Sequence, residues 1–102
     1  MNNMEQQSHN YNKHRDYVFN IMEEVVIDSV KAMLAVCADV CKCDTCMYNI
    51  SAIVLNSVPP HYVTTKTGEM YSRAEQLDSA SKTQISVEVA RAIEKVRSRP
   101  LH

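Results

Sequence analysis

Four cysteines fall within ten consecutive residues of this chain. They occupy positions 37, 41, 43 and 46, in the stretch CADVCKCDTC, and the sequence has no other cysteine. A structural zinc ion takes four sulfur or nitrogen ligands in a tetrahedron, and two cysteines separated by two residues bind one ion through a tight turn. The spacing therefore predicts a zinc site formed by Cys37, Cys41, Cys43 and Cys46, with no coordination position left for a catalytic water.

Other interpretations of the cysteine cluster stay open. An iron–sulfur cluster generally takes its cysteines from wider spacings, and a redox pair at Cys43 and Cys46 would be expected to follow a strand. A further alternative is that the four cysteines bind no metal and are reduced thiols packed at a bend of the chain. Cys37 could also act as a small buried hydrophobic residue, in which case His14, His61 or a second subunit would complete the metal site.

The length and charge of the chain limit its function classes. With 102 residues it is one domain, and its 11 basic and 12 acidic residues give a net charge of −1. A nucleic-acid-binding protein would have a basic excess on one face, so we expect no nucleic acid partner. The polar N-terminus and the lack of a long apolar run predict no signal peptide and no membrane partner. We expect a cytoplasmic protein, where clustered cysteines bind metal more often than they form disulfides.

The apolar pattern predicts a mostly α-helical domain over residues 12–98, between disordered tails at 1–11 and 99–102. A first helix runs from Tyr17 to Cys37 and is capped by Asn12 or Asp16. Roughly 20 residues of helix span about 30 Å. One subunit can hardly cover a helix of that length, so we expect a homodimer. The stripe on this helix is Val18, Ile21, Met22, Val25, Val26, Met33, Leu34 and Cys37.

A second helix is predicted from Thr45 to Ser57, with Asp44 as its cap. It is apolar on nearly every side, which is typical of a buried central helix. Pro59 and Pro60 end it, because proline has no backbone N–H to donate.

The second half of the chain begins with an extended loop that turns at Gly68, the only glycine. Ser72 and Glu75 form a capping box for a short helix that ends at Leu77. Ser81 and Gln84 form another, which opens an amphipathic C-terminal helix. The apolar stripe of this last helix is Ile85, Val89, Ala92, Ile93 and Val96.

No arrangement typical of catalysis stands out in the sequence. It has no paired carboxylates, no nucleophile with a matched histidine and no glycine-rich phosphate loop. We therefore expect a binding or scaffolding protein rather than an enzyme.

The stretch CKCDTCMYNISAIVLNSVPPHYVTTKTGEMY resembles the late competence development protein ComFB family. The resemblance rests on three cysteines, Leu55-Asn56 and the run from Pro59 to Thr64, and it covers roughly residues 17–97. One departure is Asn49, where the family often has an aspartate. The resemblance implies a helical, non-enzymatic homodimer with cysteine-bound zinc. It also implies either a receptor for a cyclic dinucleotide, chiefly cyclic di-GMP, or an adaptor of the natural transformation machinery that contacts another protein.

A cyclic di-GMP receptor needs aromatic faces for guanine and cations or donors for phosphate. A two-fold symmetric ligand would also suit a two-fold dimer interface. The alternative is that the tyrosines pack on the core and the cations are solvated. The candidate ligand-binding residues are His61, Tyr62, Thr64, Thr65, Lys66, Tyr71 and Arg73.

Overall fold

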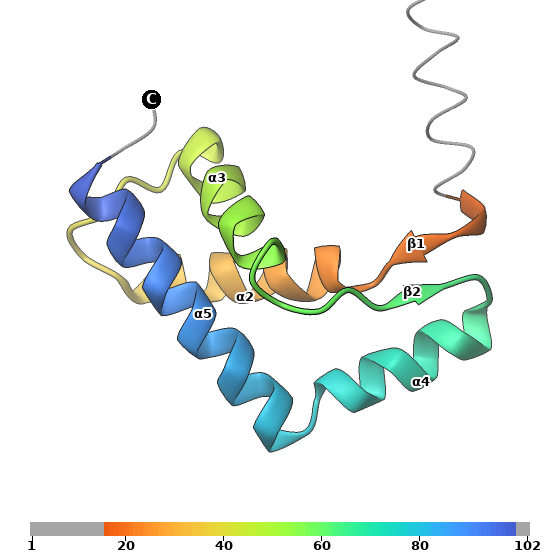
Figure 1. Cartoon of the computed structure of the whole chain (residues 1–102). Helices are drawn as coiled ribbons and strands as arrows, with labels where there is room; N and C mark the ends of the chain where they lie inside the picture. Colours follow the sequence, from red (N-terminus) through yellow and green to blue (C-terminus); the bar gives the residue numbers. More distant parts are fainter. Residues whose placement is uncertain (1–15, 100–102) are drawn as a thin grey trace, which may run out of the picture.

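The computed structural model of the chain describes residues 16–99. The predicted tail at 1–11, the proposed cap Asn12, His14 and the last three residues lie outside this part. The described part is mostly helical, as the sequence predicts (Figure 1). Its elements are β1 (Phe19–Asn20), α2 (Met22–Val36), α3 (Asp44–Leu55), β2 (Tyr62–Val63), α4 (Lys66–Gln76) and α5 (Ser79–Ser98).

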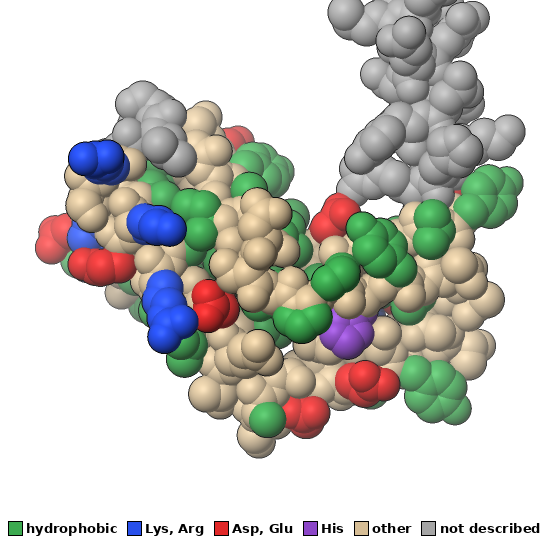
Figure 2. Space-filling view, viewed as in Figure 1, with side chains coloured by type: hydrophobic (Ala, Val, Ile, Leu, Met, Phe, Trp, Pro, Cys, Tyr) green, Lys and Arg blue, Asp and Glu red, His purple; other side chains and the backbone are tan. Residues whose placement is uncertain are grey.

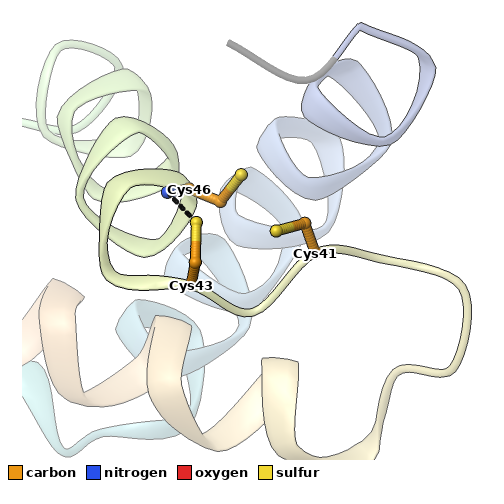
Figure 3. Close-up of side chains that lie close together, drawn as sticks. All are labelled: Cys41, Cys43 and Cys46. Atoms are coloured by element: carbon orange, nitrogen blue, oxygen red, sulfur yellow. Dashed lines mark hydrogen bonds between the residues drawn. The ribbon is translucent and has the colours of Figure 1, made fainter. Parts of the chain in front are cut away.

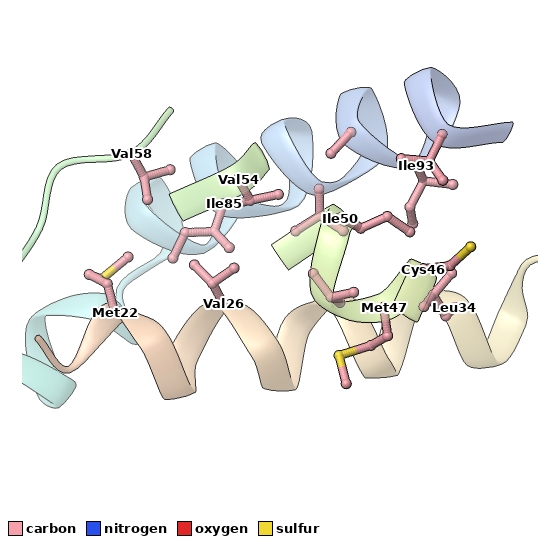
Figure 4. Packing of buried hydrophobic residues seen from close by; sticks show 14 of the residues in the cluster. Met22, Val26, Leu34, Cys46, Met47, Ile50, Val54, Val58, Ile85 and Ile93 are labelled. Carbon is pink, nitrogen blue, oxygen red and sulfur yellow. The ribbon is translucent and has the colours of Figure 1, made fainter. Parts of the chain in front are cut away.

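The core lies between α2, α3 and α5 (Figure 4). Helix α3 packs against both of the others, so it is the central helix that its composition predicts. The predicted stripe of α5 is buried along its whole length. The largest fully buried side chains of the core are Ile21, Met22, Val26, Val30, Cys46, Ile50, Val54 and Val89.

The predicted start of the first helix at Tyr17 is wrong. The chain is extended at Phe19–Asn20, where β1 pairs antiparallel with β2, and α2 begins only at Met22. Helix α2 therefore has 15 residues and is about 22 Å long. The length of α2 therefore gives no reason to expect a second subunit, and the longer helix is α5, with 20 residues.

Asn20 joins the start of α2 to the segment before β2. Its Oδ1 accepts hydrogen bonds from the backbone N–H groups of Met22, at 3.1 Å, and His61, at 2.8 Å. The backbone N–H of Ile21 also donates to the carbonyl oxygen of His61, at 3.0 Å. Asn20 thus serves the first turn of α2 in place of the expected cap Asp16. It binds a partner 41 residues away, which sequence pattern does not reveal.

We expect Asn20→Ala to lower the free energy of unfolding by about 1–2 kcal/mol, because two half-buried N–H groups lose their acceptor. Asn20→Asp is the matched control, since it keeps an oxygen in the same place. Urea unfolding followed by circular dichroism measures both. An alanine variant as stable as the parent would contradict this role of the Asn20 side chain.

Helix α4 begins six residues before the predicted capping box at Ser72. Thr65 is its N-cap, and the Thr65 Oγ1 accepts the backbone N–H of Gly68 at 2.9 Å. Gly68 therefore lies in the first turn of a helix, not at a loop turn. A Cβ atom at this position would lie 3.1 Å from Thr65 Oγ1, so glycine leaves room for the cap.

Helix α5 also begins before its predicted capping box. Asp78 is the N-cap, and its Oδ1 accepts the backbone N–H of Ser81 at 2.9 Å. Ser81, the predicted cap, is therefore already inside the helix. Asp78 is among the residues most favoured at this position.

Helix α4 turns polar side chains toward the rest of the protein. Arg73 binds Glu69 on its own helix and Glu24 of α2, while Gln76 is buried. The large apolar residues Met70 and Tyr71 are 69% and 71% exposed. This is the reverse of the usual arrangement of an amphipathic helix, so the outer face of α4 is an apolar surface.

The surface carries its side-chain types in different regions (Figure 2). Lys and Arg side chains gather over α5, at the left of this view, and hydrophobic side chains lie around the strands and α4, at the right. Two of the α5 arginines, Arg91 and Arg97, pair with glutamates one turn away. None of the described helices has both the length and the hydropathy of a membrane span.

Candidate functional site

Three of the four cysteines lie together at the start of α3 (Figure 3). The Sγ atoms of Cys41, Cys43 and Cys46 all lie within 4.8 Å of one another. Cys41 comes from the loop after α2, whereas Cys43 and Cys46 belong to the N-terminal turn of α3. Cys43 is exposed, Cys41 is half-buried and Cys46 is buried in the core, and no disulfide joins them.

Cys43, not the predicted Asp44, is the N-cap of α3. Its Sγ accepts the backbone N–H of Cys46 at 3.4 Å, and Asp44 is the first residue of the helix. This N–H, followed by the Cys41 thiol, lowers the pKa of Cys43. Burial, followed by the Cys41 and Cys43 thiols, raises the pKa of Cys46 to about 12. The pKa of the exposed Cys43 thiol is thus lowered, and the pKa of the buried Cys46 thiol is raised.

The three thiols fit a zinc ion. With Zn–S bonds of about 2.3 Å, two sulfurs on one tetrahedral ion are about 3.7 Å apart. Sulfurs already within 4.8 Å of one another need only small side-chain movements to reach that spacing. A divalent cation would also favour the thiolate form of Cys46 that burial opposes.

Cys37 is not part of this group. It is the C-cap of α2, and it packs half-buried against the core. This position agrees with the alternative in which Cys37 acts as a small hydrophobic residue. The three close sulfurs leave one tetrahedral position, and Cys37 as its ligand stays a prediction.

His61 cannot complete the metal site within one chain. Its backbone is bonded to Asn20 and Ile21, before the first residue of α2. The cysteine cluster follows the last residue of α2, about 22 Å away along the helix.

Three of the predicted ligand-binding residues meet at the N-terminus of α4. Thr64 and Thr65 precede the helix, Lys66 is its first residue, and all three are exposed. Tyr62, just before them on β2, is 65% exposed. The tyrosine does not pack on the core, so its ring face is available to a planar ligand.

The other predicted ligand-binding residues are elsewhere or already engaged. Tyr71 is on the outer face of α4, one turn further along. The guanidinium of Arg73 is held by Glu24 and Glu69, and these bonds raise the pKa of Arg73. The ring Nε2 of His61 lies 3.2 Å from Nε2 of Gln76. Arg73 and His61 therefore fix α4 to the rest of the protein.

A cavity of about 200 Å³ lies beside His61, at the junction of α4 and α5. Its lining includes the apolar residues Met22 and Ile85 and the polar residues Glu75 and Gln76. Among its polar lining residues, the sequence predicts a ligand-binding role for His61 and capping roles for Glu75, Ser81 and Gln84. Gln76 gives no signal in the sequence, because its burial depends on contacts with distant segments.

Comparisons with known proteins agree with the resemblance. The family model described as late competence development protein ComFB matches residues 19–100.

The chain belongs to the ComFB family. Among solved structures, that of the late competence protein ComFB from Bacillus subtilis is similar, with a TM-score of 0.73 and 28% sequence identity. The match covers 81% of this chain and 91% of the Bacillus protein. No curated protein matches the chain. The ComFB match includes the cysteine cluster, the central helix and the N-terminus of α4, so the predicted sites lie within the family domain.

Proposed function

We propose that this ComFB-family chain is a non-enzymatic regulatory protein of the cytoplasm that binds cyclic di-GMP as a homodimeric receptor and carries a structural zinc ion. The observation that supports the ligand most is the exposed group at the N-terminus of α4. Tyr62, Thr64 and Lys66 lie there at alternate positions of the sequence, and all three are exposed.

The chemistry of this group suits a nucleotide. The dipole of α4 favours an anion at its N-terminus, and the ammonium group of Lys66 adds a positive charge for a phosphate. The exposed Tyr62 ring offers a face for guanine, and the Thr64 hydroxyl is a further donor. We expect Arg73 to contribute indirectly, by holding α4 in place.

Zinc has a structural role in this proposal. A zinc ion bound by Cys41, Cys43 and Cys46 joins the loop after α2 to the first turn of α3. That connection fixes the central helix against its neighbours in a domain whose core is small.

The outer face of α4 supports a second copy as partner. Met70 and Tyr71 form an exposed apolar surface with Ala74, and two-fold pairing would bury the same surface on both copies. Sedimentation equilibrium of the purified chain measures its mass. A monomer at all concentrations would remove the homodimer from the proposal.

Isothermal titration calorimetry tests the ligand. We expect micromolar binding of cyclic di-GMP to the parent chain and at least a ~10-fold weaker affinity for Lys66→Ala, since one charged contact to phosphate is lost. Lys82→Ala is the matched control, because Lys82 is an exposed lysine on α5 and should bind as the parent does. Absence of heat and of any thermal shift would reject the receptor and leave the adaptor of the transformation machinery.

A further inference from the structure

The three clustered thiols differ in their exposure to solvent. Cys43, at the N-cap of α3, is exposed, and Cys46, three residues later, is fully buried. Residues three apart lie on one face of a helical turn, and these two sulfurs are within 4.8 Å of each other. A small oxidant from solvent therefore reaches the exposed Cys43 sulfur first, and the buried Cys46 sulfur lies close to it (Figure 3).

We propose that Cys43 is a site of reversible oxidation by hydrogen peroxide. The oxidation closes a disulfide between Cys43 and Cys46 and releases the zinc ion. The zinc step rests on the proposed function; the disulfide step does not.

The chemistry takes two steps. The Cys43 thiolate attacks one peroxide oxygen, the O–O bond breaks, and the other oxygen leaves as water after taking up a proton, so Cys43 becomes a sulfenic acid. The Cys46 sulfur then attacks the Cys43 sulfur, and the second oxygen leaves as water. Two thiols lose two electrons and two protons in total, and one peroxide becomes two molecules of water.

The position of the pair gives the oxidation a structural consequence. Sulfurs joined to each other no longer act as thiolate ligands, so two of the three clustered ligands are lost at once. Cys41 alone cannot retain zinc, and the connection between the loop after α2 and the first turn of α3 is broken. Since Cys46 lies in the core, the change starts at the junction of the central helix with its neighbours.

Cys41 is a less suitable partner for Cys43. It comes from the loop, and a single residue separates it from Cys43. Within the N-terminal turn of α3 the backbone already brings positions 43 and 46 together.

The zinc-loaded full chain, treated with a small excess of hydrogen peroxide, tests this proposal. Zinc release is followed with a chromogenic zinc indicator, and the disulfide is located by peptide mapping without reduction. We expect release of about one zinc ion per chain together with a Cys43–Cys46 linkage, both reversed by dithiothreitol and added zinc. Cys37→Ala keeps the clustered thiols, so it should form the same Cys43–Cys46 linkage.

The outcomes separate the two proposals. Zinc retained with no disulfide, or a linkage through Cys37 or Cys41 in the parent and in Cys37→Ala, overturns the oxidation site and leaves the zinc site standing. A Cys43–Cys46 linkage in a chain purified without zinc supports the oxidation site and rejects the structural zinc. Cys46→Ser provides a further check, because its Cys43 should stop at a sulfenic acid that dimedone labels.

Discussion

Replacement of Ile50 by alanine should lower the free energy of unfolding by about 3–4 kcal/mol. Ile50 is fully buried in the middle of α3, where the central helix contacts both α2 and α5. These two helices are themselves packed against each other, so the space left by the lost side-chain atoms cannot close easily. Small domains are stable by only about 5–15 kcal/mol, so this one change would remove a large part of the total.

Ile53→Ala on the same helix is the matched control. Ile53 is only partly buried, so its truncation removes the same atoms but leaves a smaller cavity, and we expect about half the loss. Urea unfolding of both variants in zinc-containing buffer compares them at equal metal occupancy. Equal losses at positions 50 and 53 would mean that α3 is not packed on two sides as described.

Helices α3 and α5 could be predicted because their own side chains decide their packing. The stripe from Ile85 to Val96 repeats at helical spacing and faces the core over its whole length. The composition of α3 gives no polar face, and the helix is central. In both helices, hydrophobic burial and helical periodicity favour the same structure.

Helix α4 and strand β1 could not be predicted in this way. The inner face of α4 is polar, with Arg73 and Gln76 paired to residues elsewhere in the chain, so apolar periodicity misplaces its start. Val18 and Ile21 continue the spacing of α2, but Phe19–Asn20 pairs with β2. Pairing between distant segments overrides local propensity there.

The candidate metal site could be predicted in large part, because short spacing alone keeps Cys41, Cys43 and Cys46 together. Cys37 is separated from them by three residues of loop, and the conformation of the loop decides where its sulfur lies. The ends of the helices were harder to predict from the sequence. A cysteine N-cap follows none of the usual preferences, and the acceptor role of Asn20 depends on His61.

The largest effect at the candidate site is expected for Cys43→Ser, with loss of the bound zinc and a melting temperature lower by more than ~10 °C. A serine hydroxyl does not replace a thiolate as a zinc ligand, and the loss of a ligand from a structural site reduces folding stability directly. The same hydroxyl is a good N-cap, so the helix start is preserved and the change isolates the metal. Metal analysis and differential scanning calorimetry measure the two effects.

Removal of zinc with a chelator tests whether the metal causes the difference in melting temperature between the parent chain and Cys43→Ser. If zinc accounts for the difference, the stripped parent and stripped Cys43→Ser should melt at nearly the same temperature, because the remaining contacts of α3 are equal. Cys37→Ser is the second comparison: unchanged zinc content means that the three clustered cysteines are sufficient, and loss of zinc identifies Cys37 as the fourth ligand. A parent chain that melts equally high with and without chelator would show that the bend before α3 does not depend on a metal ion.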